Sequence, residues 1–372
     1  MNRALVLSSF LVNFFLLHLF LSFAFFLGFL VLQHFTSNRR SRLRRDLLFY
    51  SLALPPALAW VVLGASLIPP FFTLEDHLCN PHFHISHPYH HLCFFESPIS
   101  LPSSLLFRGL LIVSLSLILF ALIRGLHLCW QRRVLLQWLT RRSAIPQDWE
   151  DLTPQARSLL QEFREREGAR IYLLRSHLPV SFLCGLFTPQ IILSTGLLRL
   201  LSFRQIRALL QHEMAHHMRR DNLTQLFLSF CRDLLFLSPT GHFLLRKWRQ
   251  EAELWCDEFA IYRTRRPLDL AEALLKVQKA LAIENPFGSG NRLCSAFLQP
   301  LGTPFLERRI RHILTFCDRD LARPHGISAS VSPLVGLVGF TTCSFFLLSL
   351  SEIWLCPLLL HCQLERIIRF LV

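Results

Sequence analysis

Gln211-His212-Glu213-Met214-Ala215-His216-His217 is the stretch around which the rest of the chain is interpreted. His212 and His216 are four residues apart, so on a helix their imidazoles lie on one face. Two neutral imidazoles at this spacing can hold a zinc ion between them. Glu213 would lie beside that metal, where a carboxylate can take a proton from a water molecule that zinc has made acidic. The stretch therefore predicts a zinc site with a general base.

The residues before the motif favour a helix at this position. A five-residue pattern also arises by chance, and the chain holds 17 histidines, so context has to support the match. Ser202 and Gln205 have the spacing of a capping box, in which each side chain caps the backbone of the other. Ile206, Leu209 and Leu210 then form one apolar stripe. The motif is thus expected inside a helix.

A second acidic motif follows roughly forty residues later. Glu253 can complete three protein ligands and leave the fourth zinc position for water. Asp257, four residues on, can accept a hydrogen bond from a ligand histidine. A pair of acids on a solvated helix surface is the ordinary alternative, but apolar Leu254 and Trp255 flank this pair.

Other polar residues near the motifs keep two interpretations open. Asp221 is placed to bond a ligand histidine or to end a helix in solvent. His242 and His312 are candidates for a group that stabilises negative charge in a transition state. The spacing assigns none of these roles.

Composition favours a membrane protein. Of 372 residues, 52% are hydrophobic and 17% charged, which is unusual for a soluble enzyme. The net charge of +14 suits a nucleic-acid binder, yet the arginines crowd beside apolar runs, as the positive-inside rule describes. We therefore expect no nucleic-acid partner. The eleven cysteines include no Cys-x-x-Cys pair, which disfavours zinc-ribbon and thioredoxin-like proteins.

Four apolar runs are long enough to span a bilayer. The first is too long for a signal peptide and is read as a retained anchor. Arginines follow the first and third runs and place those ends in the cytoplasm. The segment 134–139 is amphipathic and suits the membrane surface, whereas 352–372 suits either an interfacial helix or a second crossing. The runs are 5–32, 47–69 (interrupted by Pro55-Pro56), 105–122 and 331–350.

The segment 71–103 lacks Lys and Arg and should be extracytoplasmic. It is rich in histidine and contains Cys79 and Cys93. A loop closed by a Cys79–Cys93 disulfide is the simpler interpretation, and a metal-capturing loop is the alternative.

From Ala144 the composition resembles that of a soluble domain. Thr153-Pro154 is expected to open a helix that Gly168 closes. Short strands are predicted at 170–174, 181–186 and 190–194. We interpret 190–194 as a sheet edge that could bind an extended peptide, with an ordinary buried strand as the alternative. A helical hairpin that dips into the membrane or packs on the spans is predicted at 226–246, and further helices at 267–283 and 304–316.

These segments give three regions. Residues 1–125 form a membrane region with three spans and the loop 71–103, residues 144–320 a zinc metallopeptidase domain, and residues 331–372 a last span and a membrane-associated tail. The predicted fold is a mainly α membrane protein with several transmembrane helices and an α+β zincin-like domain that has a small sheet.

Three groups of residues carry a resemblance to known proteins: His212-Glu213-x-x-His216, Asp221-Asn222 and Glu253-x-x-Cys256-Asp257. They resemble the membrane-bound gluzincin metallopeptidases, both the BlaR-type sensor peptidase domain and the HtpX-like and CAAX prenyl protease group. The Cys before Asp257 and the stretch 185–194 look nearer to the sensor peptidases, and Arg309-Ile310 is similar to a late helix of the HtpX-like group. The resemblance covers roughly residues 144–316.

The resemblance implies His212, His216 and Glu253 as ligands of one zinc ion per chain, Glu213 as general base and Asp257 as the orienter of a ligand. It implies a metalloendopeptidase of the bacterial inner membrane with its domain in the cytoplasm, acting on membrane or regulatory proteins in quality control or signalling. The expected partners are a protein or peptide substrate and the lipid bilayer. A non-enzymatic receptor or metal-binding scaffold is the alternative, although a scaffold needs no Glu213.

Overall fold

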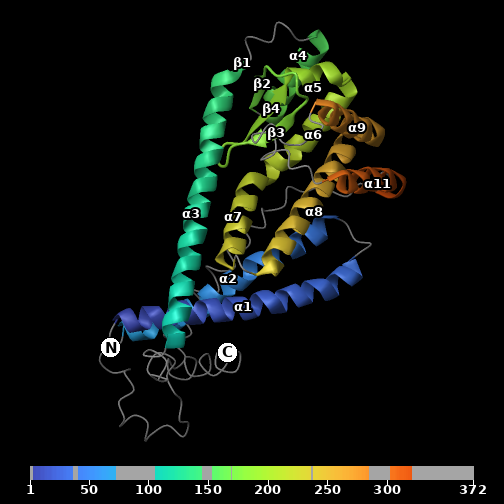
Figure 1. Cartoon of the computed structure of the whole chain (residues 1–372). Coiled ribbons are helices and arrows are strands. Elements are labelled where there is room, and N and C mark those ends of the chain that lie inside the picture. The colour runs from blue at the N-terminus through green and yellow to red at the C-terminus, as the bar shows by residue number, and fades with distance from the viewer. Residues whose placement is uncertain are drawn as a thin grey trace, which may run out of the picture.

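The computed structural model describes residues 3–36, 41–72, 105–144, 153–168, 170–235, 238–284 and 302–320. This part of the chain is mostly helical and contains one small sheet (Figure 1). The predicted histidine-rich loop beyond Phe72, with Cys79 and Cys93, lies outside the described residues, as do the fourth predicted span and the tail.

The elements follow one another in this order: α1 (Arg3–Thr36), α2 (Ser41–Phe72), α3 (Leu105–Arg142), β1 (Ser143–Ala144), α4 (Pro154–Glu167), β2 (Ile171–Leu174), β3 (Ser181–Cys184), β4 (Gln190–Ser194), α5 (Thr195–Leu200), α6 (Phe203–Arg219), α7 (Asp221–Leu234), α8 (Pro239–Thr264), α9 (Pro267–Glu284) and α11 (Gly302–Asp320). Predicted strands and helices in the soluble-like part agree with these bounds to within a few residues. The cap of α4 is as expected, since Thr153 accepts from Ala156 N–H and Gly168 has a left-handed φ of 64°.

Two helices of the described part have the length and apolarity to cross a membrane. They are Leu11–Gln33 within α1 and Arg108–Trp138 within α3. Their outward side chains are largely apolar and exposed, as lipid-facing side chains would be. The predicted second span is helical within α2, and that helix continues through Pro55 and Pro56. In Figure 1, α1 runs across the foot of α3, and α3 rises from there to the sheet.

A hydrophobic cluster joins the N-terminal helices to the lower ends of α7 and α8. Phe29 of α1 and Phe49 of α2 pack in it with Leu228, Leu245 and Trp248. The predicted hairpin at 226–246 therefore corresponds to the end of α7 and the start of α8, and it packs on α1 and α2. Pro239 at the first position of α8 fits the break between the two helices.

The sheet has the strand order β1-β2-β4-β3, so our interpretation of 190–194 as an edge is wrong. β4 pairs in parallel with β2 and antiparallel with β3, and all five of its residues are buried. A continuous apolar run such as Ile191–Leu193 is typical of a strand covered on both faces. The free edge on this side of the sheet is β3.

Helices cover both faces of the sheet. Leu159 of α4 and Leu210 of α6 pack with Ile191 on one face, while Leu135 of α3 packs against Ile192 on the other. The segment 134–139 is therefore part of α3 and lies against the sheet. It is not a separate helix on the membrane surface, because its apolar side chains are needed to cover β2, β3 and β4.

Candidate metal centre

The predicted capping box fixes the start of α6. Ser202 N–H donates to Gln205 Oε1 at 3.0 Å, and Gln205 N–H donates to Ser202 Oγ at 3.5 Å. The helix ends at Arg220, which has a left-handed φ of 52°. Since α7 begins at the next residue, the chain turns sharply and places Asp221 beside the last turn of α6. The motif thus lies inside a helix, as expected.

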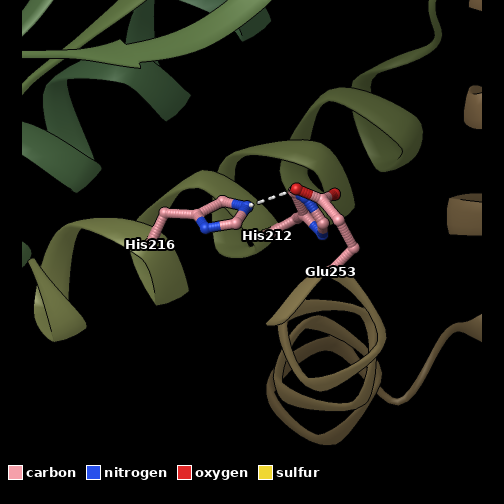
Figure 2. Close-up of side chains that lie close together, drawn as sticks. All are labelled: His212, His216 and Glu253. Atoms are coloured by element: carbon pink, nitrogen blue, oxygen red, sulfur yellow. Dashed lines mark ion pairs between the residues drawn. The ribbon is translucent and has the colours of Figure 1, made fainter. Parts of the chain in front are cut away.

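The structure brings the three predicted zinc ligands together (Figure 2). His212 Nε2 lies 3.5 Å from Glu253 Oε2, and His216 Nε2 lies 3.5 Å from Glu253 Oε1. One donor atom from each residue lies within 4.8 Å of the others. Two imidazole nitrogens of α6 and one carboxylate of α8 therefore converge on one point, although α6 and α8 are separated by α7 in the chain.

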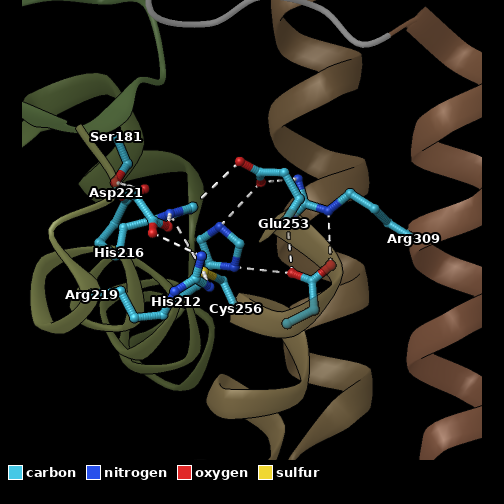
Figure 3. Close-up of polar contacts among 10 residues, drawn as sticks. Ser181, His212, His216, Arg219, Asp221, Glu253, Cys256 and Arg309 are labelled. Atoms are coloured by element: carbon cyan, nitrogen blue, oxygen red, sulfur yellow. Dashed lines mark hydrogen bonds and ion pairs between the residues drawn. The ribbon is translucent and has the colours of Figure 1, made fainter. Parts of the chain in front are cut away.

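Each histidine meets a further carboxylate through its other ring nitrogen (Figure 3). His216 Nδ1–H donates to Asp221 Oδ2 at 2.6 Å, and His212 Nδ1 lies 3.0 Å from Asp257 Oδ1. A carboxylate at Nδ1 fixes the ring and leaves Nε2 for a metal. Asp221 and Asp257 thus lie where the sequence analysis expected orienting groups.

Arg309 of α11 is a member of this cluster that sequence reasoning did not identify. Its Nε and Nη2 donate to the two oxygens of Asp257 at 2.8 and 2.7 Å, and its Nη1 lies 3.3 Å from Glu253 Oε2. Asp257 is fully buried, so this bidentate contact supplies its counter-charge. Nothing in the spacing links residues 52 positions apart, and only the similarity of Arg309-Ile310 to a known late helix drew attention to it.

Behind His216 the cluster connects to the N-terminal end of α2. Arg219 Nη2 lies 2.7 Å from Asp221 Oδ1, and its guanidinium lies 4.5 Å from the centre of the Trp255 ring. Arg45 of α2 lies 5.2 Å from the same ring. A parallel contact joins Arg44 Nε to Glu251 Oε2 at 3.0 Å. The arginines that precede the second apolar run therefore face the metal-ligand helix α8.

The carboxylates around the two imidazoles outnumber the neighbouring guanidinium groups, so two further positive charges are needed for neutrality. Four carboxylates are present, those of Glu213, Asp221, Glu253 and Asp257, against the guanidinium groups of Arg219 and Arg309. Two protonated imidazoles would complete the balance, and so would one divalent cation with neutral imidazoles. This is the electrostatic setting of a metal site that exchanges protons for metal.

The pKa values of these groups follow from the same contacts. Burial by itself lowers the pKa of His212, but the carboxylates of Asp257 and Glu253 outweigh burial and raise this pKa to about 9. The pKa of His216 is also raised, because Cys256, Glu253 and Asp221 outweigh its burial. Against burial, His216, His212 and Arg309 hold the pKa of Glu253 below its ordinary value.

A second group of donors shares His216. His216 Nδ1, Asp221 and Cys256 also lie close together, with Cys256 Sγ 3.4 Å from Nδ1. Arg219 lies beside both, 2.7 Å from Asp221 and 3.7 Å from the sulfur. A guanidinium at that position opposes a second cation, so the group with Glu253 fits a metal better.

The metal-facing side chains open into a cavity of 970 Å³ bounded by α3, β3, α7, α8, α9 and α11. Glu213 lines it, and Ser181 Oγ of β3 donates to Glu213 Oε1 at 2.8 Å. His242 and His312 are not among its lining residues, and His312 Nε2 contacts Glu258 Oε1 at 2.8 Å. The structure therefore does not bring either histidine to the metal site.

Comparison with known proteins gives one family. A family model described as BlaR1 peptidase M56 matches residues 110–295, which is half of the chain. The match runs from α3 to beyond α9, so it includes His212, His216 and Glu253 and ends before Arg309. No curated protein matches the chain.

The first prediction concerns pH. Below about 9 the metal-free His212 carries a proton that zinc must displace, so the apparent zinc affinity should fall as pH falls. Calorimetry at pH 7 in buffers of different ionisation enthalpy should show release of roughly one to two protons per zinc bound. Affinity that is constant between pH 6 and pH 8, with no proton release, would contradict this assignment.

The second prediction concerns Arg309→Lys. Lysine keeps the charge but cannot make the two parallel contacts to Asp257, so the carboxylate that orients His212 loses its position. Zinc affinity, measured by competition with a chelator, should fall by about 10- to 100-fold. Arg311→Lys is the matched control, because Arg311 is exposed on the same helix and contacts Glu307. Equal zinc affinity of the two variants would contradict the positioning role of Arg309.

Proposed function

Because the chain belongs to the BlaR1 peptidase M56 family, we propose that it is a zinc-dependent membrane metalloendopeptidase. The observation that carries the proposal is the convergence of His212 Nε2, His216 Nε2 and the Glu253 carboxylate, with Glu213 in the same cavity. Three protein ligands of this kind are the set that catalytic zinc sites use, since they leave one position for water or substrate.

The donor set and its charge fit a zinc ion. Two imidazole nitrogens and one carboxylate oxygen are ligands that zinc prefers, and each imidazole is held by a carboxylate at Nδ1. The two positive charges missing around the imidazoles equal the charge of one such ion. We therefore assign His212, His216 and Glu253 as its ligands, with one ion per chain.

When bound, zinc supplies Lewis-acid chemistry, polarising a peptide carbonyl and making a nearby water molecule more acidic. Glu213 takes the proton from that water as it attacks and later gives it to the leaving amine. The Ser181 hydroxyl, 2.8 Å from Glu213 Oε1, holds the carboxylate on the cavity side of β3. Asp221, Asp257 and Arg309 position the ligands through the contacts described above.

The free edge of β3 is the surface we assign to the peptide substrate. Val180 O accepts from Ser194 N–H, so alternate residues of β3 pair with β4 and the backbone groups of Ser181 and Leu183 point away from it. Asn222 Nδ2 donates to Leu183 O at 3.0 Å and ends the free edge there. An extended peptide can add to such an edge as a further strand beside Glu213.

We assign the protein to the bacterial inner membrane with its metal site facing the cytoplasm. Arg44 and Arg45 contact α8, which supports placing the arginine-rich segment and the metal site on the same side of the bilayer. There it would act on membrane or regulatory proteins, in quality control or in signalling. Its partners would be the protein substrate and the lipid bilayer, with no nucleic acid.

The third prediction tests the proposed function with Glu213→Gln. The amide keeps the shape of the side chain but cannot accept the proton, so cleavage of a denatured protein substrate by the detergent-purified chain should fall at least about 100-fold. Bound zinc should stay at the wild-type level, because Glu213 is not among the three converging donors.

Glu165→Gln provides the matched control, since Glu165 is exposed on α4, where it accepts a hydrogen bond from Gln161 at 2.8 Å. This variant should cleave like the wild type. A Glu213→Gln protein that binds zinc and still cleaves at the wild-type rate would refute Glu213 as the base.

A further inference from the structure

Beyond the metal donors, the cavity continues between α3, α7 and α8, where Arg124 lines it beside Asp233 and three further guanidinium groups line it as well. They belong to Arg132 of α3, Arg232 of α7 and Arg249 of α8, which we call the arginine triad. Figure 1 shows these three helices descending side by side from the sheet toward α1 and α2. Neither the proposed zinc chemistry nor the Glu213 base uses the triad.

The triad is held in place by a backbone oxygen, an amide and a carboxylate. Arg132 Nη1 donates to the backbone oxygen of Asn222 at 2.7 Å. The Gln225 side-chain oxygen, in its hydrogen-bonded orientation, accepts from Arg249 Nε and Nη2 at 3.1 and 2.9 Å. Arg232 contacts Asp233 Oδ1 at 2.6 Å, and the same carboxylate also contacts Arg124 at 3.2 Å.

Like charges crowd around Arg249. Burial and the nearby Arg232 and Arg132 lower the pKa of its guanidinium to about 10. A partly buried cation among like charges costs stability, and such clusters occur where an anion is to be received. Planar guanidinium groups are also the side chains that bind carboxylate most specifically.

The triad lies close enough to the metal donors for one bound peptide to contact both. Arg249 lies four residues before Glu253, one helical turn or about 6 Å along α8. Arg132 contacts the residue that directly follows Asp221. An extended peptide advances about 3.3 Å per residue, so a side chain two to four residues from the scissile bond would reach the triad.

We propose that the arginine triad is a specificity subsite that binds an acidic side chain, Asp or Glu, of the peptide substrate two to four residues from the scissile bond. This inference rests on the proposed peptidase function and adds a substrate class to it. The cavity face of α7 supports a peptide occupant, because Asn222, Gln225 and Ser229, which lead from the metal site to Arg232, are all polar. The amides and the hydroxyl of these α7 side chains can bond a peptide, while Leu128, Val134 and Leu135 make the facing wall on α3 apolar.

The test uses the full chain in detergent and a library of natural-sequence peptides, with cleavage sites read by mass spectrometry. Wild-type sites should be enriched at least about five-fold in Asp or Glu at one or two positions within four residues of the cut. Arg132→Gln and Arg249→Gln should lose this enrichment while keeping their zinc. The measured quantity is the ratio of cleavage near Asp or Glu to cleavage near Asn or Gln. A general loss of activity leaves this ratio unchanged.

Arg246→Gln is the matched control, because Arg246 is exposed on α8 and does not line the cavity. It should keep the acidic preference. Cleavage without any preference for acids would overturn the inference and leave the proposed function standing, as would a preference that survives in both triad variants. Cleavage that responds to phosphatidylglycerol vesicles through the triad, without acidic preference, would assign the subsite to a lipid headgroup and overturn the inference as well.

A binding measurement covers the case in which no cleavage is seen. Glu213→Gln protein is titrated with a fluorescent hexapeptide that has Glu-Glu at its centre and with its Gln-Gln counterpart. The acidic peptide should bind at least about five-fold more tightly, and adding Arg249→Gln should remove the difference. Equal binding of the two peptides would refute the subsite independently of catalysis.

Discussion

The contact between α6 and α8 buries opposite charges together. Two imidazoles face Glu253, and their outer nitrogens meet Asp221 and Asp257, which in turn meet Arg219 and Arg309. Removing one member leaves an uncompensated buried charge, which usually costs several kcal/mol, about 3–5. A divalent cation at the centre satisfies this arrangement with neutral imidazoles. The fold therefore presents a candidate metal site whose inner and outer contacts are parts of one electrostatic network.

The same helix that carries Glu253 also connects this network to the N-terminal helices. The lower part of α8 packs on α1 and α2 through Leu245 and Trp248, and its next turns contact Arg44 and Arg45 through Glu251 and Trp255. Since Trp255 also stacks under Arg219, the end of α2 and the ligand His216 lie only a few contacts apart. These contacts link the N-terminal end of α2 to α8 and, through Trp255 and Arg219, to the surroundings of His216.

Sequence patterns predicted the parts of the site that are local. The four-residue spacing of His212 and His216, the capping box of α6 and the one-turn separation of Glu253 and Asp257 are helical properties, and the structure agrees with each. The position of Gln190–Ser194 was misjudged, because strand order depends on partners elsewhere in the chain that an apolar run does not reveal. The contacts of Arg309 and of the arginine triad could not be predicted from sequence patterns for the same reason, since α3, α7, α8 and α11 meet only in the folded protein.

The most direct test of the account is the zinc content per chain of detergent-purified protein, wild type beside Glu253→Ala. The three-ligand site predicts about one zinc per wild-type chain and a sharp fall in the variant, because two imidazoles alone hold the ion weakly. Glu272→Ala, an exposed site on α9, should bind as the wild type does. No zinc in the wild type even after zinc is added back, or equal zinc in Glu253→Ala, would contradict the three-ligand site and the function proposed from it.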